Sequence, residues 1–202
     1  IEYVHQANMH STMMFFTEQG RLYWIKVYDI PEGNRQSKGR ALQNMINIQK
    51  GDKVCAFIHV KNLNDMEYVQ NHYLIFATKD GLMKKTTLES YSRPRANGII
   101  ALGLREGDRL IRVTLTDGNS QMLVASYNGK VVRFPEDTVR PMGRTATGVR
   151  AIKLDEDGQD RVIGMICVEE GSKESVLVIS EKGFGKRTDL DDENGEPIYR
   201  VT

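Results

Sequence analysis

Residues 74–88 of the chain are LIFATKDGLMKKTTL: a run of strand-forming residues, an Asp-Gly pair and a second run that ends at Leu88. The first run, residues 74–78, has high strand propensity and ends three residues before Gly81. Asp-Gly is a strong hairpin signal, because a type I′ turn needs positive φ at both central positions and glycine adopts it without strain. The stretch therefore predicts two antiparallel strands, residues 74–78 and 82–88, joined by a turn that contains the Asp80-Gly81 pair.

The same unit occurs four times along the chain. The other apolar runs, residues 13–17, 122–126 and 175–180, lead to Gln19-Gly20, Asn128-Gly129 and Lys182-Gly183. Second strands are expected after these turns at 21–27, 130–134 and 184–190. The turn glycines are 61, 48 and 54 residues apart, and a period of roughly 50 residues is the size of a propeller blade. A hydroxyl residue stands three places before every turn glycine: Thr17, Thr78, Ser126 and Ser180.

The rest of the unit also repeats. A polar loop that closes on a glycine follows the second strand in the first three copies, at 31–39, 90–98 and 135–148. A short apolar run follows, as at 99–102 and 149–154. An acidic glycine turn then leads to a fourth strand, at 54–60, 110–115 and 162–168. One short helix is expected at 40–47. Four strands per unit with little helical periodicity predict an all-β protein.

A single four-stranded sheet of this size cannot bury both of its faces, so the units must pack radially or stack. We therefore expect one all-β domain over 1–202, a propeller-like array with repeats at 1–60, 61–116, 117–168 and 169–202. The last repeat is incomplete, and a closed ring needs at least four complete blades. The chain is accordingly expected to be a piece of a longer protein.

Composition excludes several classes of protein. The chain is 40% hydrophobic and 27% charged, which is ordinary for a folded domain. No apolar run approaches the roughly 18 residues of a membrane helix, and no secretion leader opens the chain. The two cysteines, Cys55 and Cys167, are too few for a disulfide framework or a four-ligand zinc site. A cytoplasmic protein without a membrane partner is expected.

Charge follows the repeat, although the formal net charge is only +1. Residues 31–50, 82–98, 129–153 and 183–190 carry +3, +3, +4 and +1, so the remainder of the chain carries −10. Equivalent elements of a radial array lie on the same side, so these segments predict a basic stripe along the perimeter. Lysines and arginines in such a stripe would neutralise the phosphates of duplex DNA. The alternative is that outer strands and loops are simply hydrated and charged; the agreement in sign over four repeats favours DNA.

Other sequence features narrow the function further. Aromatic residues are sparse in the basic elements, which favours duplex DNA over a single strand that would need stacking platforms. The segment GFGKRT at 183–188 lacks the spacing of a phosphate-binding loop and opens a strand, so it is not assigned that role. The acidic cluster at 155–160 lacks the spacing of a calcium loop. No catalytic or metal site is predicted, since the histidines have no metal-ligand spacing: His5, His10, His59 and His72.

Several stretches resemble one known family. Residues 27–44, VYDIPEGNRQSKGRALQN, resemble the first repeat of the C-terminal domain of the bacterial DNA gyrase A protein. Residues 128–134 (NGKVVRF), 139–150 (VRPMGRTATGVR) and 183–188 (GFGKRT) resemble the same family. The resemblance implies a β-pinwheel, a propeller-like ring of six blades with exchanged strands, of which about four are represented here.

The resemblance also implies a function. This region would be non-catalytic and would wrap duplex DNA around its basic perimeter, so that the parent type II topoisomerase introduces negative supercoils with ATP. The active-site tyrosine would lie outside this chain, ATP and magnesium would act in other parts of the parent, and no cofactor is expected here. The parent would join the gyrase B protein in a two-plus-two heterotetramer on the chromosome in the bacterial cytoplasm. The resemblance assigns DNA contacts to Arg21, Lys26, Arg35, Lys38, Arg40, Lys84, Lys85, Arg93, Arg95, Lys130, Arg133, Arg140, Arg144, Arg150, Lys186 and Arg187.

Two alternatives stay open. The glycine- and arginine-rich box of the type QRRGGKG, which the gyrase family uses for supercoiling, is not in these residues. The corresponding domain of the topoisomerase IV A protein is therefore an alternative to gyrase. A protein-interaction propeller with an acidic protein partner is the alternative from another class, and DNA bending would distinguish it. No group of residues supports an enzyme in its own right.

Overall fold

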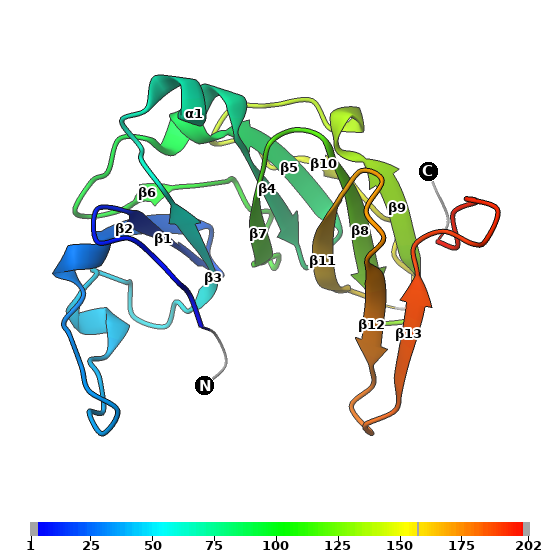
Figure 1. Cartoon of the computed structure of the whole chain (residues 1–202), viewed down its shortest axis with the longest axis horizontal. Coiled ribbons are helices and arrows are strands. Elements are labelled where there is room, and N and C mark those ends of the chain that lie inside the picture. Colours follow the sequence, from blue (N-terminus) through cyan, green and yellow to red (C-terminus); the bar gives the residue numbers. More distant parts are fainter. Residues whose placement is uncertain (1–3, 157, 200–202) are drawn as a thin grey trace.

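The computed structural model describes residues 4–156 and 158–199. The chain folds into four antiparallel sheets that follow one another along an open arc (Figure 1). The all-β, propeller-like architecture expected from the sequence is confirmed, since neighbouring sheets share a common core and strands provide most of the regular structure.

The first two sheets each take their last strand from the following repeat. In the first sheet the strand order is β3 (Val54–Val60), β1 (Thr12–Thr17), β2 (Arg21–Lys26) and β6 (Ile99–Ile100). The second sheet has the order β7 (Leu110–Thr116), β4 (Tyr73–Thr78), β5 (Leu82–Thr87) and β10 (Val149–Arg150). Strand β6 comes from the second repeat and β10 from the third.

The remaining sheets are smaller in the described part of the chain. The third contains β11 (Val162–Glu169), β8 (Ser120–Ser126) and β9 (Val131–Pro135) in that order. The fourth is a hairpin of β12 (Ser175–Ile179) and β13 (Gly185–Asp189). The four-stranded unit expected from the pattern is therefore not a self-contained sheet, because its short third run pairs with the preceding sheet. This is the exchange of strands that the family resemblance implies.

The hairpin turns are not of type I′. The turn glycines Gly20, Gly81, Gly129 and Gly183 have φ between +75° and +86°, but every non-glycine residue described has negative φ. A type I′ turn needs two positive values, so the predicted turn type is wrong. The Gly20 N–H donates to the carbonyl of Thr17 over 2.9 Å, as in a three-residue loop with glycine in the left-handed region.

The recurring hydroxyl residue stabilises this loop. The Oγ1 atom of Thr17 accepts the N–H of Arg21 over 3.1 Å. The hydroxyls of Thr78 and Ser180 likewise accept the N–H four residues further along, over 3.2 Å in each case. A hydroxyl that satisfies the first N–H after the loop explains the threonine or serine three places before the glycine in these three turns, whereas Ser126 makes no such bond.

Helical structure is confined to short segments. A one-turn 3₁₀ helix follows each of β2, β5 and β9, at Val27–Asp29, Leu88–Tyr91 and Glu136–Thr138. The helix expected at 40–47 is only a 3₁₀ turn, Leu42–Asn44. The α-helix of the described residues, α1 (Met66–Asn71), was not predicted; Asp65 caps it by accepting the N–H of Tyr68 over 3.1 Å. Within the described ranges, no helix has the length and apolar character of a membrane span.

The core lies between successive sheets. Phe16 of the first sheet meets Phe76 of the second edge to face, with ring centroids 5.6 Å apart, and both are fully buried. Ile75 and Met83 of the second sheet pack with Met122 and Phe134 of the third. Strands β3, β7 and β11 line the concave side of the arc (Figure 1). Strands β2, β5 and β9, with the loops that follow them, form the convex perimeter.

Candidate nucleic-acid interface

Exposed arginines and lysines lie on the loops that follow the outer strands. In the first repeat the loop after β2 presents Arg35, Lys38 and Arg40 to solvent. The equivalent loop of the second repeat presents Arg93 and Arg95. The third repeat presents Arg140 in its loop and Arg150 on β10, while Lys186 and Arg187 are exposed on β13. Three successive repeats thus place exposed cations on their perimeter loops.

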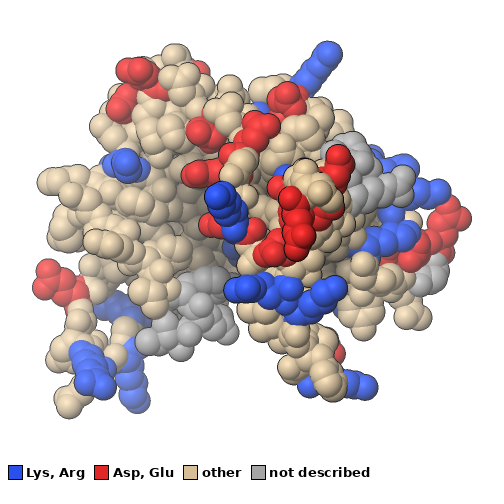
Figure 2. Space-filling view, turned by 45° about the vertical axis from the view of Figure 1, so that its right-hand side comes forward, with Lys and Arg blue, Asp and Glu red and all other residues tan. Residues whose placement is uncertain are grey.

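Charge is unevenly distributed on the face drawn in Figure 2. Acidic side chains gather in the middle of that view with a cation beside them, and groups of lysines and arginines lie below and to the right, next to further acidic side chains. Along the sequence, the outer strands and loops are basic and the remainder is acidic. An anionic ligand on this face would meet the basic zone with least repulsion.

Lys84 and Lys85 are the exceptions to the predicted pattern. The Lys84 side chain is completely buried, and its Nζ atom donates to the carbonyl oxygens of Ala101 and Arg144, each over 2.5 Å. Lys85 points to the other face of β5 and forms an ion pair with Glu136, with Nζ 2.9 Å from Oε1. The burial of both side chains contradicts the prediction that they contact DNA. The sequence of β5 alone does not reveal this burial, because partners of both lysines belong to later segments of the chain.

Two further cations that were predicted to contact DNA form hydrogen bonds or an ion pair within the protein. Arg21 donates from Nε to the hydroxyl of Tyr23 and from Nη2 to the carbonyl oxygen of Asn97 over 3.0 Å. Arg133 is 11% exposed and forms an ion pair with Asp191 over 2.6 Å. Each of these outer-strand cations therefore contacts the loop of the following repeat, as Lys84 and Lys85 do.

The remaining predicted residues have mixed surroundings. Lys130 is exposed and forms an ion pair with Asp155, and Lys26 donates to the carbonyl oxygen of His10 over 3.4 Å. Arg144 is half-buried, and its Nε atom has no hydrogen-bond partner among the described residues. The structure thus separates the predicted set into exposed loop cations and outer-strand cations that fasten one repeat to the next.

The acidic glycine turns have a structural role that the sequence pattern did not reveal. Asp52 accepts the N–H of Gln19 over 3.2 Å, which ties the β1–β2 turn to the loop before β3. Asp108 and Asp160 make the equivalent bonds to Asp80 and Asn128, over 3.0 and 3.1 Å. The signal was present as an aspartate near the start of each fourth strand. In the first three repeats these carboxylates therefore join the hairpin turn to the segment that precedes the fourth strand.

Hydrogen bonding also lowers the pKa of the Asp160 carboxyl group. Loss of hydration opposes ionisation of Asp160, but the N–H groups of Asp155, Asn128 and Arg161 outweigh it, so its pKa lies below the usual range. Asp160 is accordingly ionised at neutral pH.

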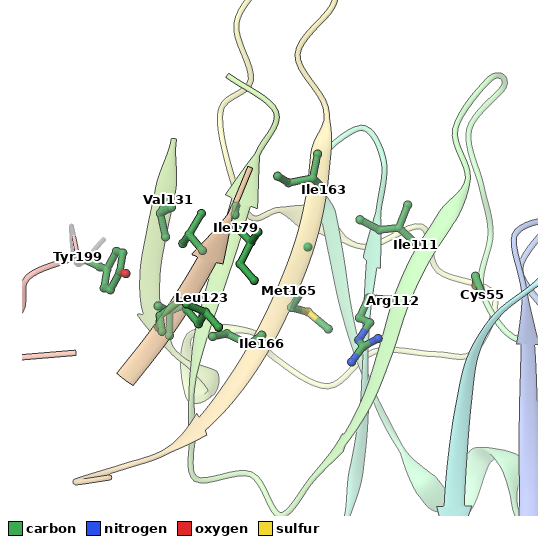
Figure 3. Close-up of a pocket in the computed structure, with 15 residues that line it drawn as sticks. Cys55, Ile111, Arg112, Leu123, Val131, Ile163, Met165, Ile166, Ile179 and Tyr199 are labelled. Carbon is green, nitrogen blue, oxygen red and sulfur yellow. The ribbon is translucent and has the colours of Figure 1, made fainter. Parts of the chain in front are cut away.

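Reactive groups are not assembled in the described residues. No three His, Cys, Asp or Glu side chains of residues 4–156 and 158–199 are placed to hold a metal ion. Burial raises the pKa of the Cys55 and Cys167 thiols to about 12, so neither is a thiolate at neutral pH. An apolar pocket on the concave side, of about 530 Å³, is lined by residues that include Ile163, Ile166 and Arg112 (Figure 3).

Comparison with known proteins agrees with this geometry. The family model for the DNA gyrase C-terminal domain, described as a beta-propeller, matches residues 11–61, 72–117, 121–169 and 174–192. The DNA gyrase A protein of Salmonella typhimurium is 44% identical over 187 residues, and that of Staphylococcus aureus is 42% identical over 183 residues. These alignments cover 92% and 91% of the chain but only 20% of either relative.

A solved structure supports the same assignment. A crystal structure of the C-terminal domain of DNA topoisomerase IV superposes with a TM-score of 0.79 at 25% identity. The superposition covers 96% of this chain and 58% of that one. Each of the four segments matched by the family model contains the hairpin of one of the four sheets, and together the segments span most of the chain. The chain therefore belongs to the DNA gyrase C-terminal domain family, with its beta-propeller fold.

Proposed function

We propose that this chain binds duplex DNA along its convex perimeter and wraps it as part of a type IIA topoisomerase. The observation that carries the proposal is the repetition of exposed cations on the loops after β2, β5 and β9, which present Arg35, Arg93 and Arg140 among others. Lysines and arginines on successive loops can contact successive phosphates and release counterions, which gives affinity with little dependence on base sequence.

The curvature of the array supports wrapping in particular. The loops follow one another along the outside of an arc (Figure 1), so a duplex that contacts all of them must bend. Smooth bending of 20–30 base pairs by 40–90° costs on the order of 1–6 kcal/mol, and several phosphate contacts can offset that cost. Small residues next to the basic ones, such as Ser37, Gly39 and Ala96, let the backbone approach the phosphates.

The parent protein proposed for this chain is the DNA gyrase A protein. The gyrase relatives are 44% and 42% identical over 92% and 91% of the chain. As gyrase, the parent would be an ATP-dependent enzyme that introduces negative supercoils together with the gyrase B protein, two copies of each, in the bacterial cytoplasm. ATP and magnesium would act in parts of the parent outside this chain, and this region would be non-catalytic.

Ligation of nicked circular DNA in the presence of the chain tests the proposal. Wrapping during ligation fixes a change in linking number, which a gel displays as a shift in topoisomer distribution. We expect a shift that grows with protein concentration, and its sign gives the handedness of the wrap. If gel retardation shows binding but the topoisomer distribution does not shift, wrapping is contradicted while contact with the phosphates remains supported. The absence of binding would favour a protein-interaction propeller.

A further inference from the structure

Lys84 occupies a position that a DNA-contacting lysine would not. It lies in the middle of β5 with its side chain 0% exposed, and its ammonium group is 4.7 Å from the centroid of the Phe76 ring. The Nζ atom donates to the carbonyl oxygens of Ala101 and Arg144 over 2.5 Å and to the Tyr91 hydroxyl over 3.2 Å. Three donors of one ammonium group thus meet three acceptors.

The three acceptors come from separate segments of the chain. Ala101 directly follows the exchanged strand β6, which completes the first sheet. Arg144 belongs to the perimeter loop of the third repeat. Tyr91 ends the 3₁₀ helix after β5, and its hydroxyl donates to the Ala101 carbonyl over 2.7 Å. One side chain therefore joins the second sheet to the exchanged segment 99–102 and to the loop 140–148.

We propose that Lys84 is a positioning residue: it anchors segments 99–102 and 140–148 to the second sheet and thereby sets where the perimeter arginines stand. The inference rests on the proposed function, since those arginines are taken to contact DNA. Arg144 is the residue most directly affected, because its own carbonyl oxygen accepts a hydrogen bond from Lys84 while the residue as a whole is only half-buried.

Comparison within the chain shows that the loop of the following repeat buries this position. The residues equivalent to Lys84, three places after each turn glycine, are Tyr23, Val132 and Lys186. Lys186 carries the same ammonium group but is exposed on β13, in the two-stranded sheet. Burial of Lys84 therefore depends on the segments packed over it and is not a property of lysine at this strand position.

The ionisation of Lys84 gives the anchor a pH signature. Burial, together with the smaller effect of the Arg144 charge, lowers its pKa from 10.5 to about 7. The groups that face the amine are the Arg144 guanidinium, the Tyr91 hydroxyl and the Phe76 ring, and no described carboxylate forms an ion pair with it. Opening the loop returns the amine to water and to its ordinary pKa, so opening takes up a proton between about pH 7 and 10. Opening is therefore favoured at the lower pH, and protection of the loop rises with pH by up to about tenfold per unit.

Hydrogen–deuterium exchange of the whole chain tests the anchor, with Lys84→Met as the variant. Methionine fits the apolar surroundings and removes only the ammonium group. Lys61→Met is the matched control, since it removes one charge from an exposed site before α1. We expect exchange at 99–102 and 140–148 to accelerate on the order of tenfold in Lys84→Met alone. We also expect its Kd for a 40-base-pair duplex to rise about two- to tenfold, because the loops must then be ordered on binding.

The outcomes separate the anchor from the proposed function. Unchanged exchange at both segments, with the circular dichroism of the wild type, would overturn the anchor. If Lys84→Met exchanges faster at both segments but binds the duplex as tightly as Lys61→Met, the anchor stands and the positioning role is overturned. If the wild type binds no duplex, the proposed function is wrong, but the exchange rates at 99–102 and 140–148 still test whether Lys84 anchors these segments. If Lys84→Met does not fold, the wild type decides: amides of 140–148 that exchange at their intrinsic rates at both pH 7 and pH 9 would show that the loop is not held, and would overturn the inference.

Discussion

The ammonium group of Lys85 lies 2.9 Å from Oε1 of Glu136, and the two side chains are 6% and 0% exposed. Glu136 also accepts the hydroxyl of Thr116 over 2.7 Å and the N–H of Ser120 over 3.3 Å. Lys85 belongs to the second sheet and Glu136 begins the perimeter loop of the third repeat, so this buried ion pair fastens one repeat to the next. Arg133 and Asp191 make the corresponding pair between the third and fourth repeats, over 2.6 Å.

Removal of one partner of the buried pair is expected to destabilise the fold strongly. Lys85→Met leaves the Glu136 carboxylate buried without a cation, which costs about 3–5 kcal/mol. Lys85→Met combined with Glu136→Gln removes both charges and keeps an acceptor for Thr116. The double variant should therefore lose less stability than the sum of the single variants, as measured by urea unfolding. Additive losses would show that the two charges do not interact.

Reversal of two exposed perimeter arginines is expected to weaken DNA binding without unfolding the chain. Arg93→Glu with Arg95→Glu replaces phosphate attraction by repulsion, and neither side chain is buried. Lys61→Glu with Arg105→Glu is the charge-matched control, on exposed residues outside the perimeter loops. Gel retardation should show a loss only for the first pair. Equal affinity of both variants, with intact circular dichroism, would place the contact surface elsewhere.

The salt dependence of binding should report individual phosphate contacts. Arg140→Gln removes one exposed cation, so the slope of log K against log salt should become less steep by about 0.9 if that residue contacts a phosphate. Lys84→Met should not change the slope, because a buried ammonium group releases no counterion. Fluorescence anisotropy over a series of salt concentrations measures both slopes.

Gly98 should be far less tolerant of substitution than Gly107. Both have positive φ, +66° and +79°, so alanine is strained at either position by roughly 1–2 kcal/mol. A Cβ atom at Gly98 would also lie 2.6 Å from the carbonyl oxygen of Leu22, whereas nothing lies within 4 Å at Gly107. Thermal unfolding should therefore show the larger loss for Gly98→Ala, which displaces β6 from β2. Equal losses would mean that the exchanged strand adapts.

The two thiols are expected to be inert in the folded chain. A pKa of about 12 leaves a thiolate fraction at pH 8 that is on the order of a thousandfold below that of an ordinary cysteine. Iodoacetamide should therefore label neither Cys55 nor Cys167 within an hour, and should label both in urea. Mass spectrometry detects each modification, and rapid labelling of either thiol in the folded state would contradict its burial.

Local pattern was sufficient to predict the strands. Residues 54–60 were predicted as a strand and form β3 with the same bounds, and the hairpins at 74–88 and 122–134 are present. The Asp-Gly and Asn-Gly pairs located the turns because only glycine adopts positive φ without strain. Their type was mispredicted, because the preceding hydroxyl residue stabilises a three-residue loop.

Burial of the outer-strand cations was not predictable from one repeat alone. Lys84 and Lys85 stand in a strand whose sequence, LMKKTT, does not distinguish an exposed edge from one covered by another segment. Arg144, one of the three acceptors of Lys84, and Glu136, the partner of Lys85, lie about 50 to 60 residues further along the chain. The exposed loop cations needed no such partner, so composition and repetition were enough to identify Arg35, Arg93 and Arg140 as candidates.

Strand exchange also determines how an array of this kind can change length during evolution. The sheet built on β1 is completed by Ile99–Ile100, and the sheet built on β5 by Val149–Arg150. A gene duplication that inserts one whole period therefore supplies both a new hairpin and the short strand that completes the hairpin before it. An insertion of half a period leaves one outer strand with an unpaired edge, which invites association with other chains. Repeat number can thus change in whole periods while each sheet that receives an exchanged strand stays complete.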